Sequence, residues 1–192
     1  MLAWGTFQAL TVRVMLTSVS RYATWRHILV TAMLAGVLAW VVVAVIGQQF
    51  KPFDLQPGLR AADIPAQLPA YTPESVRIYV RFFVLDFFLP LFAYGTLVLL
   101  WAWLQARAVP GWHGSYSWAA LFPCLPMACD WGETLAFLSL VLAWPRHWPW
   151  LGELAIGLHR GKFAGMIASN AAILLLAAAA AGTVATDRFS RS

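Results

Sequence analysis

The sequence predicts an all-α fold, an integral membrane bundle of four transmembrane helices that forms a single domain over residues 1–192. Composition is the first reason, because the chain is 61% hydrophobic and 11% charged, whereas soluble domains are roughly half apolar and about a quarter charged. The second reason is that four stretches stay apolar for about 20 residues, which is the length an α-helix needs to cross a bilayer. The 192 residues suit one such bundle with one sizeable loop.

The N-terminal residues 1–26 mix apolar side chains with Arg13, Arg21 and Arg26. They fit either a short interfacial helix in the headgroup layer or a frayed tail. The first predicted span, about residues 28–46, contains no charged residue. It is too long for the core of a signal peptide, and no small-x-small cleavage site follows it. We therefore expect it to be a retained transmembrane helix.

A Pro-rich segment, residues 48–75, separates the first two spans. Proline at this density prevents a continuous helix, so the segment is predicted to be an extramembrane loop, and long loops often carry function. The loop ends in Thr72-Pro73-Glu74. Threonine at the N-cap, proline in the first turn and an acid near the positive end of the helix dipole together indicate a helix start.

The remaining spans are predicted at about residues 76–104, 118–144 and 153–184, and short turns separate them. The small residues at 177–182 permit close helix approach. Orientation follows from the distribution of basic residues, since cytoplasmic segments carry an excess of lysine and arginine. We expect a bacterial inner membrane with both termini inside, on the basis of six arginines on one side: Arg13, Arg21, Arg26, Arg107, Arg188 and Arg191.

Charged residues inside the last three spans are the main candidates for function. At 1.5 Å per residue, and with spans that alternate in direction, they fall in the same half of the membrane. A charge in a span is costly unless it is paired or wetted, which predicts an interhelical ion-pair network. The alternative for the two bases is that they extend to the headgroups. The network comprises Asp86, Asp130, Glu133, Lys162 and Arg160.

Cofactor motifs are sparse. His159 is the one histidine placed well enough inside a span to ligate a haem or pigment, and the alternative is an interfacial or hydrogen-bonded histidine. No His-Glu-x-x-His or His-x-x-x-His spacing predicts a metal site, and Cys124 and Cys129 do not form a Cys-x-x-Cys motif. The sequence requires no cofactor, and bound lipid is expected. The scattered net charge of +5 gives no basic patch for nucleic acid.

The second span contains Arg-Phe-Phe-Val-Leu-Asp-Phe-Phe-Leu-Pro-Leu-Phe-Ala-Tyr-Gly at 81–95, the third contains Asp130-x-x-Glu133, and the fourth contains Lys162. In these features the chain resembles a group of uncharacterised bacterial four-helix integral membrane proteins. The resemblance covers the second to fourth spans and leaves out the first 26 residues. It implies four spans and the same charged positions, and it brings no established function.

Three functional hypotheses remain open from the sequence. The first is a non-catalytic accessory or assembly subunit of a larger membrane complex, of respiratory or photosynthetic type, in which loop 48–75 docks other subunits and the buried ion-pair network holds the bundle together. The small size and the lack of a catalytic motif favour it. The second is a small proton-coupled transporter, or a protein that binds lipid or solute, through the Asp/Glu/Lys cluster. The third is an enzyme acting on lipid, with the carboxylates as acid and base.

Overall fold

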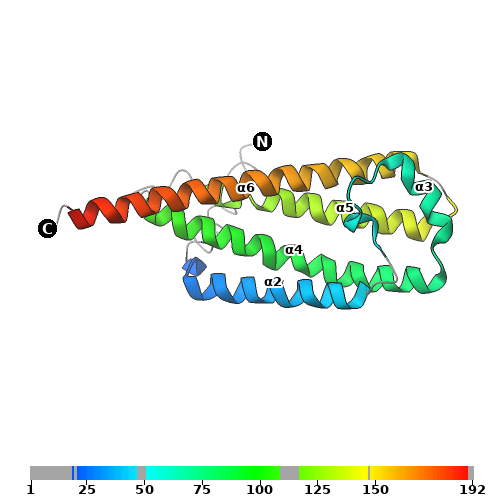
Figure 1. Ribbon diagram of the computed structural model, residues 1–192, viewed down its shortest axis with the longest axis horizontal. Helices are drawn as coiled ribbons and strands as arrows, with labels where there is room; N and C mark the ends of the chain where they lie inside the picture. The colour runs from blue at the N-terminus through cyan, green and yellow to red at the C-terminus, as the bar shows by residue number, and fades with distance from the viewer. Residues whose placement is uncertain (1–18, 20, 47–50, 109–116, 147, 190–192) are drawn as a thin grey trace, which may run out of the picture.

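The computed structural model describes residues 19, 21–46, 51–108, 117–146 and 148–189, and these ranges contain helices and no strand. The long helices α2 (Trp25–Ile46), α4 (Pro73–Ala108), α5 (Cys124–Ala143) and α6 (Pro149–Phe189) alternate in direction along the bundle (Figure 1). Four helical segments are long and apolar enough to cross a membrane. The predicted all-α bundle is therefore confirmed, while the N-terminal interfacial helix falls largely outside the described residues.

The start of α4 is formed as the sequence predicts. Pro73 is the first helical residue, and the Oγ1 atom of Thr72 accepts a hydrogen bond from the backbone N–H of Ser75 at 3.2 Å. Glu74 in the first turn and Arg77 three residues further on have exposed side chains that form an ion pair at 2.6 Å. The cap satisfies a backbone donor that the first helical turn leaves free, which fixes where α4 leaves the loop.

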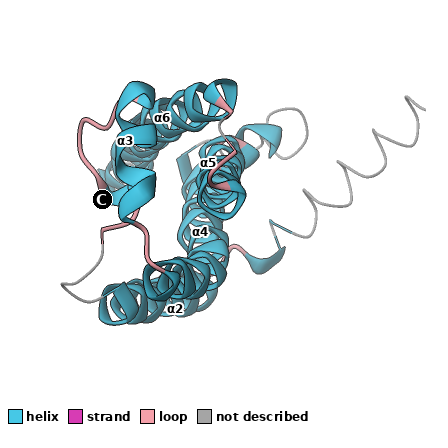
Figure 2. Ribbon diagram, turned by 90° about the vertical axis from the view of Figure 1, so that its right-hand side faces the viewer, coloured by secondary structure: helices cyan, strands magenta, loops and turns pink. Residues whose placement is uncertain are grey.

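Helix α4 lies between α2 on one side and the α5–α6 pair on the other (Figure 2). Thr96 on α4 donates a hydrogen bond to Thr31 on α2, with 2.9 Å between the two hydroxyl oxygens. The opposite face of α2 is exposed, as at Trp40, which is 72% accessible. Apolar side chains exposed along a helix of this length are typical of a surface that faces lipid or another membrane helix.

Helices α5 and α6 approach each other closely because glycines lie at their contact. A Cβ atom on Gly165 would lie 3.1 Å from the Cβ atom of Pro126. A Cβ atom on Gly132 would lie 2.9 Å from the Cδ1 atom of Leu158. With no side chains in the way, the two helices can bring polar groups at neighbouring positions into direct contact.

The connection between α2 and α4 folds back against the end of the bundle (Figure 1). It contains the short helices η1 (Phe53–Leu55), η2 (Ala61–Asp63), α3 (Ile64–Gln67) and η3 (Leu68–Ala70). Phe53, Ile64 and Leu68 are buried in the same core cluster as residues of α4, α5 and α6. The segment predicted as an extramembrane loop thus places part of its length inside the bundle.

Phe53 holds this connection in place. Its ring stacks on Tyr71 with 5.3 Å between centroids, and it lies 5.4 Å from the ring of Phe137 on α5. Burial of a phenylalanine side chain contributes about 1.5–3 kcal/mol. The next residue along the chain, Asp54, is consequently carried into the bundle with it.

Candidate functional site

Charged side chains from three helices lie at one level of the bundle. Asp86 on α4, Asp130 on α5 and Lys162 on α6 each lie about 13 residues, or ~20 Å, from the helix end nearest the α2–α4 connection. Glu133 and His159 lie about one turn closer to that end. The common depth arises because α5 runs toward the connection while α4 and α6 run away from it.

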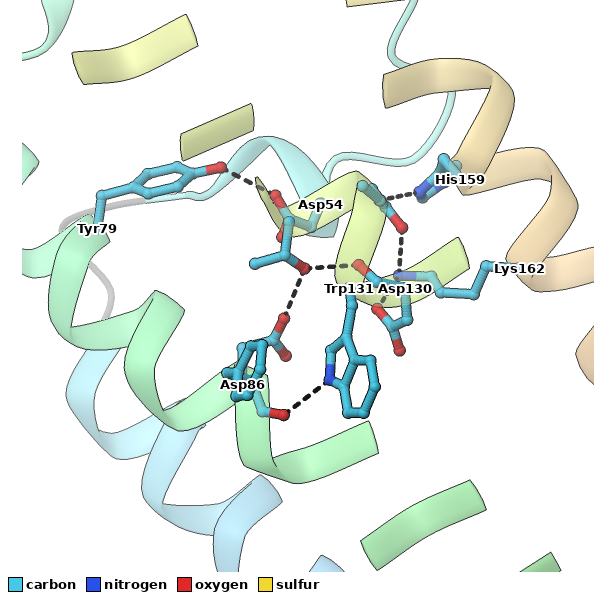
Figure 3. Close-up of polar contacts among 10 residues, drawn as sticks. Asp54, Tyr79, Asp86, Asp130, Trp131, His159 and Lys162 are labelled. Atoms are coloured by element: carbon cyan, nitrogen blue, oxygen red, sulfur yellow. Dashed lines mark hydrogen bonds and ion pairs between the residues drawn. The ribbon is translucent and has the colours of Figure 1, made fainter. Parts of the chain in front are cut away.

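Lys162 joins the two acids of α5 (Figure 3). Its Nζ atom lies 3.0 Å from Oδ1 of Asp130 and 2.6 Å from Oε2 of Glu133. Asp130 and Glu133 are three residues apart, and residues at this spacing share a helix face. One ammonium group therefore reaches both carboxylates. Glu133 is fully buried at 0% exposure, so these contacts replace its hydration.

His159 completes the surroundings of Glu133. Its Nδ1 atom lies 2.5 Å from Oε1 of Glu133, the oxygen that Lys162 does not contact. The ring meets Phe163 edge-on, with 4.9 Å between centroids. The histidine that the sequence offered as a haem or pigment ligand is thus held by a carboxylate and an aromatic ring, and each oxygen of Glu133 has a nitrogen partner.

Asp86 reaches the cluster through Thr134 rather than through a base. The Oγ1 atom of Thr134 lies 3.0 Å from Oδ2 of Asp86 and 3.0 Å from the backbone oxygen of Asp130. A hydroxyl group has one hydrogen, so it satisfies one of these two acceptors at a time. A protonated Asp86 would supply the second hydrogen, and the geometry therefore suits a carboxyl group that carries a proton part of the time.

Pro90 changes the backbone of α4 beside this cluster. Proline has no N–H, so the carbonyl group of Asp86 lacks the donor that position 90 normally supplies in a helix. The next carbonyl, that of Phe87, accepts a hydrogen bond from Nε1 of Trp131 at 2.8 Å. The rings of Phe87 and Trp131 stack with 5.2 Å between centroids. These contacts join α4 to α5 at the level of the acids (Figure 3).

A fourth carboxyl group, which the sequence analysis did not select, comes from the α2–α4 connection. Asp54 is 8% exposed, and its Oδ1 atom accepts a hydrogen bond from the hydroxyl group of Tyr79 at 2.9 Å. Its Oδ2 atom is buried without a hydrogen-bond partner among the described residues. Burial, together with the negative charges of Glu133 and Asp86, raises the pKa of Asp54 to about 7, although the hydrogen bond from Tyr79 opposes this shift.

Arg160 does not join the cluster. It is exposed, and within the part of the chain that the structure describes it forms no ion pair with these acids. It precedes Lys162 by two residues, a rotation of roughly 200° around the helix, so the two bases point to different faces. Compared with the network expected from the sequence, the cluster in the structure lacks Arg160 and includes Asp54. The residues it brings together are Asp54, Asp86, Asp130, Glu133, Thr134, His159 and Lys162.

The acids outnumber the bases in this acidic cluster, by which we mean Asp54, Asp86, Asp130, Glu133, His159 and Lys162. If every carboxyl group were ionised, Lys162 and a protonated His159 would neutralise only half of them. An unpaired buried charge costs several kcal/mol, and buried groups avoid this cost by taking up protons. The arrangement is suited to holding exchangeable protons. Among the described residues, no group of three or more His, Cys, Asp or Glu side chains has an arrangement that could hold a metal ion.

The chain matches no protein-family model, and comparison with curated proteins and with solved structures found no significant similarity. The fold and the site themselves define a class. The protein is an all-α bundle with four helices apolar enough to cross a membrane, and an acid-rich cluster lies where α4, α5, α6 and the α2–α4 connection meet.

Proposed function

We propose that the protein is a small proton-coupled transporter and that the acidic cluster binds the coupling proton within the membrane. The surplus of carboxyl groups over bases is the observation that carries the proposal. A cluster that only held helices together is expected to be close to neutral, because each unpaired buried charge costs stability. Carboxyl groups that exchange protons inside a membrane are typical elements of proton pathways in pumps and transporters.

The contacts of Glu133 offer a way to couple proton binding to conformation. Its two oxygens contact Lys162 and His159, both on α6. If the cluster passed a proton to Glu133, the charge that holds these bases would be lost and the polar contact between α5 and α6 would weaken. A ligand shifts a conformational equilibrium only through its different affinity for the two states. Here the affinity for the proton would differ between a state in which the α5–α6 contact is formed and a state in which it is broken.

The proposed setting is a bacterial inner membrane with both chain termini in the cytoplasm. This orientation places the α2–α4 connection on the outer side, because α2 begins on the side of the N-terminal arginines. Protons at the connection end of the acidic cluster would then come from the side of higher proton concentration in a respiring cell. The transported solute is not assigned.

An accessory-subunit role is the second candidate, and the exposure of α2 favours it. This helix packs on α4, and its outer side chains Met33, Trp40 and Val43 are exposed. Another subunit or lipid would cover them. Native mass spectrometry after gentle extraction distinguishes the two. A fixed stoichiometry with a second polypeptide supports the subunit role, and a monomer or homo-oligomer with only lipid bound speaks against it.

The proton-binding proposal is tested by infrared titration of carboxyl groups in the purified protein. Between about pH 5 and pH 9 the band of protonated carboxyl groups should lose intensity as protons leave the acidic cluster. Asp86→Asn should remove part of this change, because the partner of Asp86 is the hydroxyl group of Thr134 and not a base. Glu153→Gln is the matched control, because Glu153 is an exposed acid near the start of α6. A band that stays constant across this range in the wild-type protein would refute the proposal.

Translocation is tested separately in liposomes that contain a pH-sensitive dye and carry an inside-negative potassium diffusion potential. We expect proton uptake above that of empty liposomes, a strong reduction in Glu133→Gln and Asp130→Asn, and unchanged uptake in Glu153→Gln. If the carboxyl groups titrate but no uptake is seen, the proton-binding proposal stands and the transporter proposal is contradicted. Uptake that both cluster variants retain would place the pathway elsewhere.

A further inference from the structure

Asp54 occupies a position between the loop end of the bundle and the rest of the acidic cluster. Its partner Tyr79 lies about six residues, or ~9 Å, into α4. Asp86 lies about two turns deeper on the same helix. Through its contact with Tyr79, Asp54 therefore lies at a depth between the loop end and the deeper carboxyl groups.

The surroundings of Asp54 are otherwise apolar. Phe53, Phe82 and Phe137 are each 1% exposed and belong to one core cluster, which closes this end of the bundle. An ion does not cross such a layer readily, because leaving water for an apolar interior is costly. A side chain that can be neutral or charged offers a route for a proton through this layer, and Asp54 is such a side chain.

The titratable groups that face Asp54 come from each element packed around it. Tyr79 and Asp86 lie on α4, Glu133 lies on α5, and Tyr71 ends the connection. Burial and the charge of Asp54 raise the pKa of Tyr71, so this phenol stays protonated at neutral pH. Of these groups outside the membrane-spanning helices, Asp54 is therefore the one that exchanges a proton near neutrality.

We infer that Asp54 is the relay that carries protons between water at the loop end and the deeper carboxyl groups of the cluster. The inference rests on the proposed proton-binding function and adds the residue through which the proton enters and leaves. A hydronium ion protonates the Asp54 carboxylate and becomes water. The acid then gives the same proton to an ionised carboxyl group of the cluster, and Asp54 returns to its charged form. Tyr79 holds Oδ1, so Oδ2 carries the proton; because Oδ2 is buried, it meets hydronium only when local opening at the loop end admits water.

The protonation behaviour of Asp54 is compatible with this role. A proton carrier works best when its pKa lies near the working pH, since both forms are then populated. The pKa of about 7 meets this condition. Asp63 lies in the same connection but does not meet this condition. Its ion pair with Arg60 at 3.0 Å holds the pKa of its carboxyl group below the usual value.

The test follows proton exchange after a pH jump on one side of full-length protein in liposomes, with the infrared carboxyl band as the signal. Asp54→Asn keeps an oxygen that accepts the hydrogen bond from Tyr79 but cannot carry a proton. We expect it to slow exchange from the loop side by about a hundredfold, to leave exchange from the other side unchanged, and to preserve the amplitude of the deeper carboxyl titration. Asp54→Glu should retain most of the wild-type rate, and Asp63→Asn should retain all of it.

Chemical rescue separates a relay from a structural role. A small weak acid such as formic acid can carry a proton in place of the missing carboxyl group, and it should restore loop-side exchange in Asp54→Asn. Wild-type rates in Asp54→Asn would overturn the relay and leave the proton-binding function standing. Loss of the deeper carboxyl titration in Asp54→Asn would also overturn it, because Asp54 would then be required for proton binding by the other carboxyl groups and not only for the rate of exchange.

A second variant keeps the inference testable if Asp54→Asn does not fold. Tyr79→Phe removes the hydrogen bond that stabilises the charged form of Asp54. The pH at which loop-side exchange is half-maximal should therefore move upward, with the fully protonated rate unchanged. An unchanged midpoint in Tyr79→Phe would show that Asp54 does not limit exchange.

Discussion

Removal of Lys162 should destabilise the bundle in a way that depends on pH. In Lys162→Met the side chain keeps its length and loses its charge. Asp130 and Glu133, which the ammonium group contacts at 3.0 and 2.6 Å, then lose their shared partner. His159 still contacts one oxygen of Glu133, but Asp130 retains no base within the described ion pairs.

The magnitude follows from the burial of the three side chains. Glu133 is fully buried, and Asp130 and Lys162 expose 15% and 14% of their side chains. Breaking a buried pair by removing one partner typically costs about 3–5 kcal/mol. We expect a loss in this range at alkaline pH, where both acids are ionised. The loss should become smaller at acidic pH, because uptake of a proton removes the uncompensated charge.

The assay is reversible unfolding in mixed detergent micelles, followed by circular dichroism at several pH values. Arg160→Met is the matched control, since Arg160 is an exposed base two residues away on the same helix. It should change the free energy of unfolding by less than about 0.5 kcal/mol. The double variant Asp130→Asn/Lys162→Met should lose about 0.5–3 kcal/mol less stability than the sum of the losses in the two single variants. A loss in Lys162→Met that is small, or equal at all pH values, would show that Lys162 does not neutralise Asp130 and Glu133.

Further predictions concern the helix contact and the connection. Gly165→Ala places a Cβ atom 3.1 Å from Pro126 and should cost about 1–3 kcal/mol of unfolding free energy, whereas Gly157→Ala meets nothing within 4 Å and should be neutral or stabilising in the same assay. Phe53→Ala should cost about 3–5 kcal/mol and expose the α2–α4 connection to protease. Burial raises the pKa of Asp54 to about 7. The protonated carboxyl group therefore contributes up to about 4 kcal/mol to the free energy of unfolding, and this contribution is fully present below about pH 4 and is lost as pH rises through 7. The free energy of unfolding of Asp54→Asn, measured against pH, should lack this dependence.

Much of the fold could be predicted from the sequence because membrane helices are set by length and composition. The first predicted span, 28–46, differs from α2 by three residues at its start. The start of α4 was predicted from Thr72 and Pro73, because capping is a local property of the backbone. The proximity of Asp130, Glu133 and Lys162 followed from helix rise and alternating direction alone.

The remainder of the site depends on tertiary packing. Nothing local in Pro-Phe-Asp-Leu at 52–55 distinguishes Asp54 from other loop acids, since its burial results from the insertion of Phe53 among aromatic rings of α4 and α5. Arg160 and Lys162 lie at nearly the same depth, and only the rotation of α6 decides which of them faces the acids. Gly165, three residues after Lys162, lies against Pro126 of α5, so Lys162 is on the face of α6 that packs against α5.

The acidic cluster is proposed to hold protons that exchange with water. The most direct measurement is the infrared carboxyl titration of wild-type protein and Asp86→Asn under identical conditions. We expect a band of protonated carboxyl groups that declines between about pH 5 and pH 9 and is reduced in the variant. Identical and pH-independent bands in both proteins would contradict this proposal.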